Sequence, residues 1–287
     1  MPAAVAIGWL TAAVTVSLVV YVGQNSAGHD HSPRPGAKRA GPAASVTVAS
    51  AALTRVQAAR WVAQQVNPAA VVACDPEMCS VLQASGLSAG RLLALPLSAT
   101  DPLGADVVVA TSAVRGQFGD RLASVYAPQV IASFGSGTER IDVRAVAPDG
   151  TAAFQAGLTA DHAARISAGE QLLHNKAIRL AASTQADLTE GDVDPRLLTA
   201  LAALADQYQL SIASFDDPSP GAPDAPLRGA EVRGATPATL RPMLSFLLGQ
   251  RSPYLPAQAF LVPAGRGQYL LRVQYAAPSP LGLPNSP

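Results

Sequence analysis

The stretch AVVACDPEMCSVLQASG, residues 70–86, contains one apolar strand and the helical segment that follows it. Its first five residues, 70–74, are all apolar and include two β-branched valines, which is typical of a strand covered on both faces of a sheet. Asp75 opens a turn before Pro76, and Gly86 is suited to cap the end of the helical segment. A strand followed by a helix is the repeating unit of an α/β fold. The stretch therefore sets the expected fold class.

The same alternation continues on both sides of this stretch. An amphipathic helix is expected before it, and further strands and a helix after it, with the last two strands joined by the turn sequence GSGTE. The expected elements are a helix at 51–66, strands at 91–95, 106–110, 129–134 and 140–146, and a helix from Thr111 or Ser112 to about Tyr126. Together they predict a three-layer α/β sandwich with a mostly parallel sheet at 51–148.

The second half is expected to form a smaller α+β domain at 149–277. It opens with a long helical pattern at 151–174, on which Asp161 and Arg165 are spaced as an ion pair on an exposed face. Asp194 followed by proline is a typical helix start, with the aspartate as the N-cap.

The remaining elements of this half alternate less regularly and end in a β-hairpin. They are strands at 177–182, 210–215 and 227–232, helices at 183–188, from Pro195 and from Pro237, and a hairpin at 258–276. The last residues, 278–287, are expected to form a disordered tail.

An apolar segment near the N-terminus predicts a membrane anchor. The sequence AAVAIGWLTAAVTVSLVVYV, Ala3 to Val22, has no charged side chain and the length of roughly 20 residues that a transmembrane helix needs. We expect a single-pass anchor at 1–23 and, from its Gly, Pro and Ser content, a flexible linker at 24–50. A cleaved signal peptide is the rival interpretation, but its apolar core should be only about 7–15 residues long.

Two observations disagree about the side of the membrane on which the rest of the chain lies. Arg34, Lys38 and Arg39 follow the apolar segment, which by the positive-inside rule favours the cytoplasm. Cys74 and Cys79, the two cysteines of the chain, are close enough in sequence to form a disulfide, which favours an oxidising compartment. We expect a disulfide between them and an extracytoplasmic head on a single-pass cell-membrane protein.

The composition limits the classes of partner. With 20 basic and 20 acidic residues, the chain has no excess of charge for binding nucleic acid. Its abundant Ala, Pro and Gly with little Lys are typical of an actinobacterial protein. Small residues at Ala4, Gly8 and Ala12 would let two anchors pack as a homodimer, although chance explains this pattern at least as well in so Ala-rich a chain.

The candidate ligand-binding residues lie where the predicted strands end. Parallel sheets bind ligands at the carboxyl ends of their strands. The residues expected there are Asp75, Thr111, Ser112, Gly135, Ser136 and Gly137. Each also has a structural interpretation, because Asp and Ser cap helices and Gly supplies the positive φ of a hairpin turn.

No cofactor or metal is expected. Neither a G-x-G-x-x-G nor a Walker loop follows the first strand, so a nucleotide cofactor is not predicted. His162, Glu170 and His174 are spread too far along one helix to ligate a single zinc ion.

The first domain resembles a soluble segment at the C-terminal end of actinobacterial membrane glycosyltransferases of the protein mannosyltransferase-like superfamily. The resemblance covers roughly 58–146 and is carried by AARWVAQQVNPAAVVACD, ADVVVATSAVR and VIASFGSGTERIDVRAV. It implies a shared fold. The membrane-embedded catalytic part of those enzymes has no counterpart in this sequence.

Residues 173–232 resemble actinobacterial domains related to the zinc D-alanyl-D-alanine carboxypeptidases, especially through LLHNKAIRLAASTQADLTEGDVDPRLLTALAALADQYQLSIASF. In that family, histidine and aspartate ligands follow the strand that corresponds to 210–215. Here the corresponding segment reads PLRGAEVRG, and no histidine follows His174. A zinc site needs three protein ligands, so the resemblance implies a domain without that chemistry.

These observations favour a non-catalytic, membrane-anchored binding or scaffold protein of the actinobacterial cell envelope, whose partner is an envelope component or a membrane protein. One alternative is an accessory subunit of lipid-linked glycosylation. Another is a hydrolase or transferase of cell-wall material that uses carboxylates, for which the candidates are Asp75, Asp216, Asp217 and Asp224.

Overall fold

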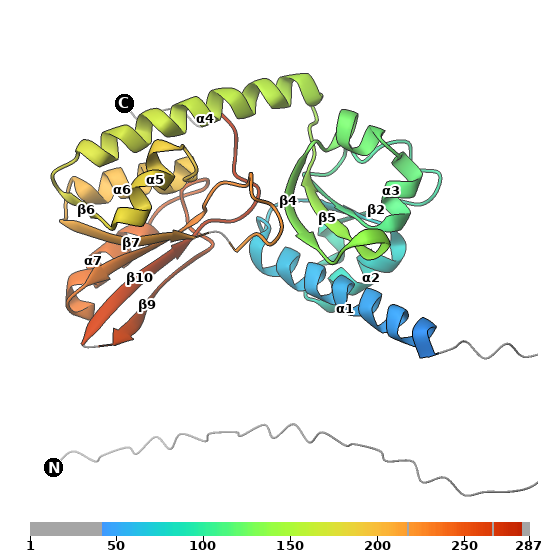
Figure 1. Ribbon diagram of the computed structural model, residues 1–287, viewed down its shortest axis with the longest axis horizontal. Helices are drawn as coiled ribbons and strands as arrows, with labels where there is room; N and C mark the ends of the chain where they lie inside the picture. Colours follow the sequence, from blue (N-terminus) through green and yellow to red (C-terminus); the bar gives the residue numbers. More distant parts are fainter. Residues whose placement is uncertain (1–41, 217, 266, 283–287) are drawn as a thin grey trace, which may run out of the picture. The chain divides into compact units, whose positions relative to one another are not determined.

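The computed structural model describes residues 42–216, 218–265 and 267–282. The predicted anchor at 1–23 and most of the predicted linker at 24–50 lie outside these ranges. Within the described ranges, no helix has the length and apolar character to cross a membrane. The described residues belong to one compact unit with a mixed α/β architecture built on two five-stranded sheets (Figure 1).

The first sheet is mixed rather than mostly parallel. Its strands are ordered β2-β1-β3-β5-β4, where β1 is Val72–Cys74, β2 is Leu92–Ala94, β3 is Val107–Ala110, β4 is Gln129–Phe134 and β5 is Ile141–Ala145. β1 pairs in parallel with β2 and β3, whereas β5 is antiparallel to both β3 and β4. The short turn between β4 and β5 enforces this change, since closely joined neighbouring strands must run antiparallel.

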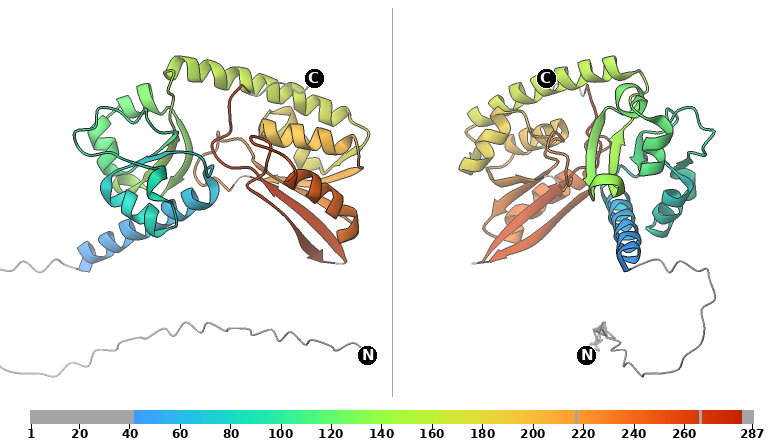
Figure 2. Two further views of the ribbon diagram at one scale, coloured as in Figure 1. Left: turned by 180° about the vertical axis from the view of Figure 1, so that it is seen from behind. Right: turned by 45° about the vertical axis from the view of Figure 1, so that its right-hand side comes forward.

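Helices cover both faces of the first sheet, as Figures 1 and 2 show. Val107 and Val109 of β3 lie in one apolar core with α1 (Pro42–Gln65) and α2 (Pro76–Ala84). Val108 lies in a second core with α3 (Ser112–Phe118) and the π-helical turn η2 (Leu122–Tyr126). A strand that is buried on both sides needs continuous apolar sequence, which is what the VVVA of β3 provides.

Two helix boundaries differ from the sequence prediction. Helix α1 begins at Pro42, within the segment predicted as a flexible linker, rather than at residue 51. The helix predicted to run from Thr111 or Ser112 to about Tyr126 is interrupted, because Gly119 has a φ of 55° and ends α3. Two short 3-10 turns, η1 (Ala89–Arg91) and η3 (Gly137–Glu139), lie in the loops before β2 and β5.

The second sheet has the order β6-β7-β8-β10-β9. β6 (Ile178–Leu180) pairs in parallel with β7 (Leu210–Asp216), and β8 (Gly229–Gly234), β9 (Gln258–Gly265) and β10 (Gln268–Gln274) continue the sheet in antiparallel pairs. Its helices are α4 (Thr151–His174), α5 (Ala182–Thr189), α6 (Pro195–Ala205) and α7 (Pro237–Leu248).

Short contacts join the two sheet regions. The loop after β7 reaches the edge strand β4, where the Ser133 amide donates to the Pro220 carbonyl at 2.6 Å (Figure 1). The Trp61 indole of α1 donates to the Pro218 carbonyl at 3.0 Å. After β10, the Ala277 amide donates to the Gln65 carbonyl at 2.6 Å. The chain therefore returns twice from the second sheet to the first.

Candidate functional site

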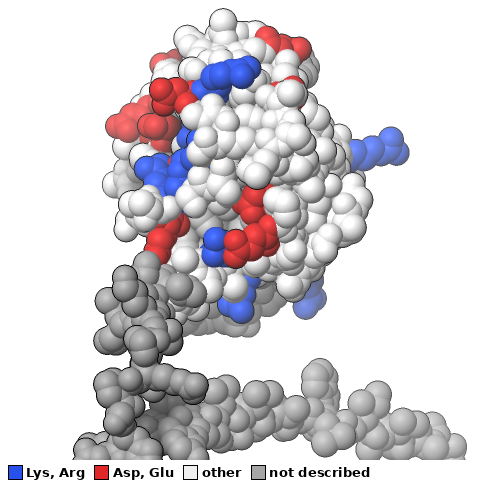
Figure 3. All heavy atoms as spheres, turned by 90° about the vertical axis from the view of Figure 1, so that its right-hand side faces the viewer, with Lys and Arg blue, Asp and Glu red and all other residues white. Residues whose placement is uncertain are grey.

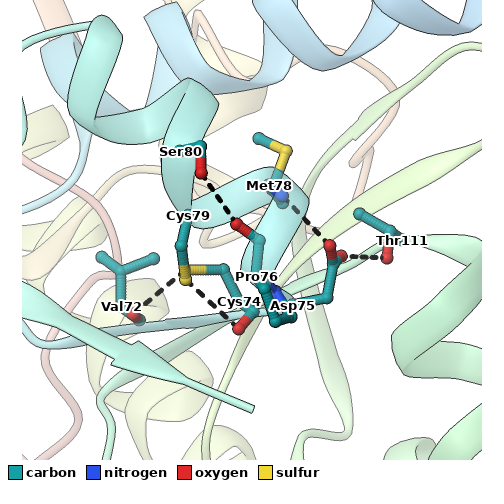
Figure 4. Close-up of a disulfide and its surroundings, with 8 residues drawn as sticks. All are labelled: Val72, Cys74, Asp75, Pro76, Met78, Cys79, Ser80 and Thr111. Atoms are coloured by element: carbon teal, nitrogen blue, oxygen red, sulfur yellow. Dashed lines mark hydrogen bonds between the residues drawn. A yellow bond between two sulfur atoms is a disulfide. The ribbon is translucent and has the colours of Figure 1, made fainter. Parts of the chain in front are cut away.

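The structure brings Asp75 and Thr111 together at the carboxyl ends of β1 and β3, as the sequence predicts for a parallel pair (Figure 4). The Thr111 hydroxyl donates to Oδ2 of Asp75 at 2.6 Å, and the Met78 amide donates to Oδ1 at 3.0 Å. Thr111 Oγ1 in turn accepts from the Val114 amide at 3.4 Å. Both side chains are buried, and both cap helices, α2 and α3 respectively. The polar atoms of both side chains are therefore used in hydrogen bonds that stabilise the fold.

Ser112 is exposed at the start of α3, beside a small hollow of about 200 Å³. Thr111 and Ser112 line this hollow together with Arg55 of α1 and Glu139 of η3. Arg55 forms an ion pair with Glu77 at 3.2 Å. The hollow is the part of the structure that corresponds to the predicted strand-end site.

The predicted glycine turn contributes to this hollow through its later residues, Thr138 and Glu139. Gly135 and Gly137 both have positive φ, 68° and 57°, which fits the hairpin interpretation. A Cβ on Gly135 would lie 2.9 Å from Cγ2 of Thr54, so this glycine also allows the turn to approach α1. Ser136 precedes η3 and makes no side-chain cap bond to it.

The predicted disulfide between Cys74 and Cys79 is present, with its Cα atoms 5.4 Å apart (Figure 4). It joins the last residue of β1 to α2, and both residues are buried. In the sequence, Asp75 follows the bridged Cys74 and precedes Pro76, the first residue of α2. The disulfide therefore fixes the corner that positions the Asp75 carboxylate.

A larger hollow, about 620 Å³, lies where α4, β4 and the loop at 221–224 meet; we call it the α4 cleft. The sequence reasoning did not identify it. Its polar lining includes Gln129, Arg140, Gln155, Thr159, His162, Arg165 and Asp224. The segments that form it lie far apart in the chain. The available signal was the spacing of Gln155, Thr159 and His162, which places them on one face of α4.

Two of the α4 side chains in this cleft are held by the turn after α5. His162 Nε2 lies 2.9 Å from the Glu190 carbonyl, and because a carbonyl can only accept, this nitrogen donates. Arg165 donates to the Gly191 carbonyl, and its Nε donates to Asp161 at 2.9 Å. Burial raises the pKa of Asp161, and the charge and hydrogen bond of Arg165 partly offset this effect.

Arg140 lines the α4 cleft from the start of the β5 segment. Its Nε donates to Asp142 at 2.7 Å, and Asp142 also accepts from the Ser133 hydroxyl at 2.7 Å and pairs with Arg144 at 3.8 Å. Burial lowers the pKa of Arg144, and the nearby Asp142 opposes that shift. The Arg140 side chain is about half exposed, and its bond to Asp142 fixes its position.

The described carboxylates proposed for the hydrolase or transferase alternative lie in different parts of the structure. Asp75 caps a helix, Asp224 is exposed and lines the α4 cleft, and Asp216 ends β7 beside Gly229. Asp217 lies outside the described residues. In the described ranges no three His, Cys, Asp or Glu side chains are grouped so that they could hold a metal ion.

Comparisons with protein-family models, with curated proteins and with solved structures found no match to this chain. The two family resemblances drawn from the sequence therefore stay predictions.

Proposed function

We propose that the protein is a non-catalytic binding or scaffold protein of the actinobacterial cell envelope, anchored by residues 3–22 and carrying its folded head outside the cytoplasm. The observation that favours a binding role over catalysis by Asp75 is the bonding of this side chain. Both oxygens of this carboxylate accept hydrogen bonds. The bond from the Met78 amide caps the start of α2, and the bond from the Thr111 hydroxyl joins the ends of β1 and β3. A general base needs a carboxylate that reaches the substrate proton.

The disulfide supports the extracytoplasmic position of the head. Disulfides persist in oxidising compartments and are rare in the cytosol of mesophiles. Cys74 and Cys79 are both buried and bonded to each other. Mass analysis of the protein isolated from its membrane with thiols blocked should find both cysteines oxidised. Two free thiols in the mature protein would contradict this position.

The surface charge favours a partner that does not bind mainly through a patch of acidic or of basic side chains. On the face shown in Figure 3, the described Lys and Arg side chains are interspersed with Asp and Glu. The whole chain has equal numbers of acidic and basic residues. An envelope component or a membrane protein that contacts mixed polar and apolar surface fits this distribution.

Cross-linking in intact cells tests the binding function. We expect the full chain to fractionate with membranes and to cross-link to an envelope polymer or a membrane protein. A version without residues 1–23, exported by an unrelated cleavable signal, is the control and should leave the membrane fraction. Turnover of wall-derived material by the purified full chain, abolished by Asp224→Asn, would instead support the hydrolase or transferase alternative.

The accessory-subunit alternative makes a different prediction. If the protein assists lipid-linked glycosylation, deletion of its gene should reduce surface glycans while the peptidoglycan stays unchanged. Unchanged surface glycans in the deletion strain would remove this alternative and leave the binding function in place.

A further inference from the structure

We propose that the α4 cleft binds a small, hydroxylated anion, such as a sugar unit that carries a carboxylate or a phosphate. This inference rests on the proposed binding function and names a site and a ligand class for it. The cleft volume, about 620 Å³, is within the range of roughly 300–1,000 Å³ that is usual for small-molecule sites. The cleft also lies where the two sheet regions meet, a common position for such sites.

Positive charge is the first reason for choosing an anion. Arg140 and Arg165 both line the cleft, and Asp224 is the one acidic side chain among its described lining residues. Arg165 is paired with Asp161, and Arg140 shares Asp142 with Arg144 outside the lining. The guanidinium group is planar and forms paired hydrogen bonds to carboxylate and phosphate oxygens. Arg140, whose side chain is about half exposed and shares its carboxylate with Arg144, is the group that a ligand oxyanion would contact.

Pre-organisation is the second reason. Arg165 is buried, and its bonds to Asp161 and to the Gly191 carbonyl fix its guanidinium before any ligand arrives. His162 is fixed in the same way by the Glu190 carbonyl. Gly191 has a φ of 72°, and a Cβ there would lie 2.7 Å from Cγ1 of Ile166, so a larger residue would strain this turn. Side chains that are ordered beforehand lower the entropic cost of binding.

The uncharged lining supports hydroxyl groups on the ligand. Gln129, Gln155 and Thr159 offer amide and hydroxyl groups that can both donate and accept. Asp224 can accept from a ligand hydroxyl. Among the described lining residues there is no Phe, Tyr or Trp ring on which a nucleobase could stack. A sugar-sized oxyanion therefore fits this lining better than a nucleotide.

Isothermal titration calorimetry with the full chain in mild detergent at low salt tests the inference. The probes are glucuronic acid, glucose 1-phosphate and uncharged glucose. We expect at least one of the two anions to bind at least ~10-fold more tightly than glucose, as charge-assisted hydrogen bonds imply. The anion that binds identifies the ligand chemistry as a carboxylate or a phosphate.

Arg140→Gln should weaken anion binding about 10-fold or more, because it removes one charged donor from the cleft. Arg272→Gln is the matched control: Arg272 is about as exposed as Arg140, at 51% against 47%, and its Nε lies at the same 2.7 Å from a carboxylate, that of Glu231. It does not line the cleft. Gln155→Ala, an exposed change on α4, is a second cleft variant and should also weaken binding.

Equal binding of glucose and the anions, unchanged binding by both cleft variants, or absence of anion binding to the folded wild-type chain would each overturn the inference. Circular dichroism of each variant establishes that it is folded. Envelope cross-linking in cells is an independent readout. If cross-linking succeeds and the anions do not bind, the proposed function stands and the anion site falls.

Discussion

At the scale of single residues, Thr111 has two structural roles that its exposed neighbour lacks. Its hydroxyl donates to Asp75 and accepts from the Val114 amide at the start of α3. We expect Thr111→Val to lower the free energy of unfolding by about 1–2 kcal/mol, the usual effect of losing a helix cap. Ser112→Ala, one residue further on, should change it by less than about 0.5 kcal/mol.

Urea denaturation followed by circular dichroism measures both variants. Equal effects of the two substitutions would show that the capping bonds of Thr111 do not hold this corner. A strong effect of Ser112→Ala on envelope cross-linking, with stability unchanged, would instead indicate that the small hollow beside α3 contacts the partner.

The buried pair of Asp194 and Arg196 makes stability depend on pH. Burial alone would raise the pKa of Asp194, but the hydrogen bonds and charge of Arg196, together with the Ser279 hydroxyl, hold this pKa below its usual 3.8. A carboxyl whose pKa is lowered in the folded state stabilises the fold above the unfolded value. That stabilisation is lost as the pH falls below 3.8 through the folded pKa.

Asp194→Asn should therefore cost about 3–5 kcal/mol at neutral pH, because it leaves the buried Arg196 without its charged partner. The difference from wild type should shrink as the pH falls below 3.8, because the carboxyl of the unfolded chain then binds a proton while the folded one stays ionised down to its own lower pKa. Burial is the main cause of the raised pKa of Asp161, which gives the opposite slope above 3.8; the charge of Asp194 contributes to this raised pKa, so the slope due to Asp161 should be smaller in the variant. Thermal unfolding between pH 2 and pH 7 measures this difference; a constant gap would contradict the assignment.

At the scale of elements, the close contact of α4 and α5 depends on one glycine. A Cβ on Gly169 of α4 would lie 2.3 Å from the Leu188 carbonyl oxygen, which is backbone and cannot move aside. Gly169→Ala should therefore destabilise the protein by about 1–3 kcal/mol, although alanine favours helix. Gly116→Ala in α3 is the control, since nothing lies near its Cβ and the change should stabilise by up to about 1 kcal/mol.

Chemical denaturation of the two glycine variants decides between propensity and packing. Opposite signs are expected. If Gly169→Ala also stabilised the protein, α4 and α5 could not approach as closely as the structure shows.

At the scale of the whole molecule, the sequence predicted a mixed α/β architecture, and the structure confirms it. Buried strands such as 106–110 were recognisable because their apolar sequence is local information. The antiparallel attachment of β5 to β3 and the α4 cleft depend on long-range pairing, which sequence periodicity does not encode. For the same reason, Asp161 and Arg165 were predicted on an exposed face and are buried. Their burial depends on the turn after α5, which is more than twenty residues away in sequence.

The loop at 218–222 couples the two sheet regions, and this coupling can be tested by hydrogen exchange. The Trp61 indole donates to the Pro218 carbonyl, and two residues later the Pro220 carbonyl accepts from the Ser133 amide at the edge of β4. Trp61→Phe keeps an aromatic ring beside Phe134 but removes the indole N–H donor. Losing one such bond costs about 1 kcal/mol, so the Ser133 amide should exchange roughly 5- to 10-fold faster.

The amide of Val143, in the middle of the first sheet, is the internal control and should keep its protection, because β5 pairs with strands on both sides. Exchange that accelerates equally at Ser133 and Val143 would mean that Trp61 stabilises the first sheet as a whole. Unchanged exchange at both amides would mean that the loop is held without the indole bond. A change confined to Ser133 is the result that assigns the coupling to this loop.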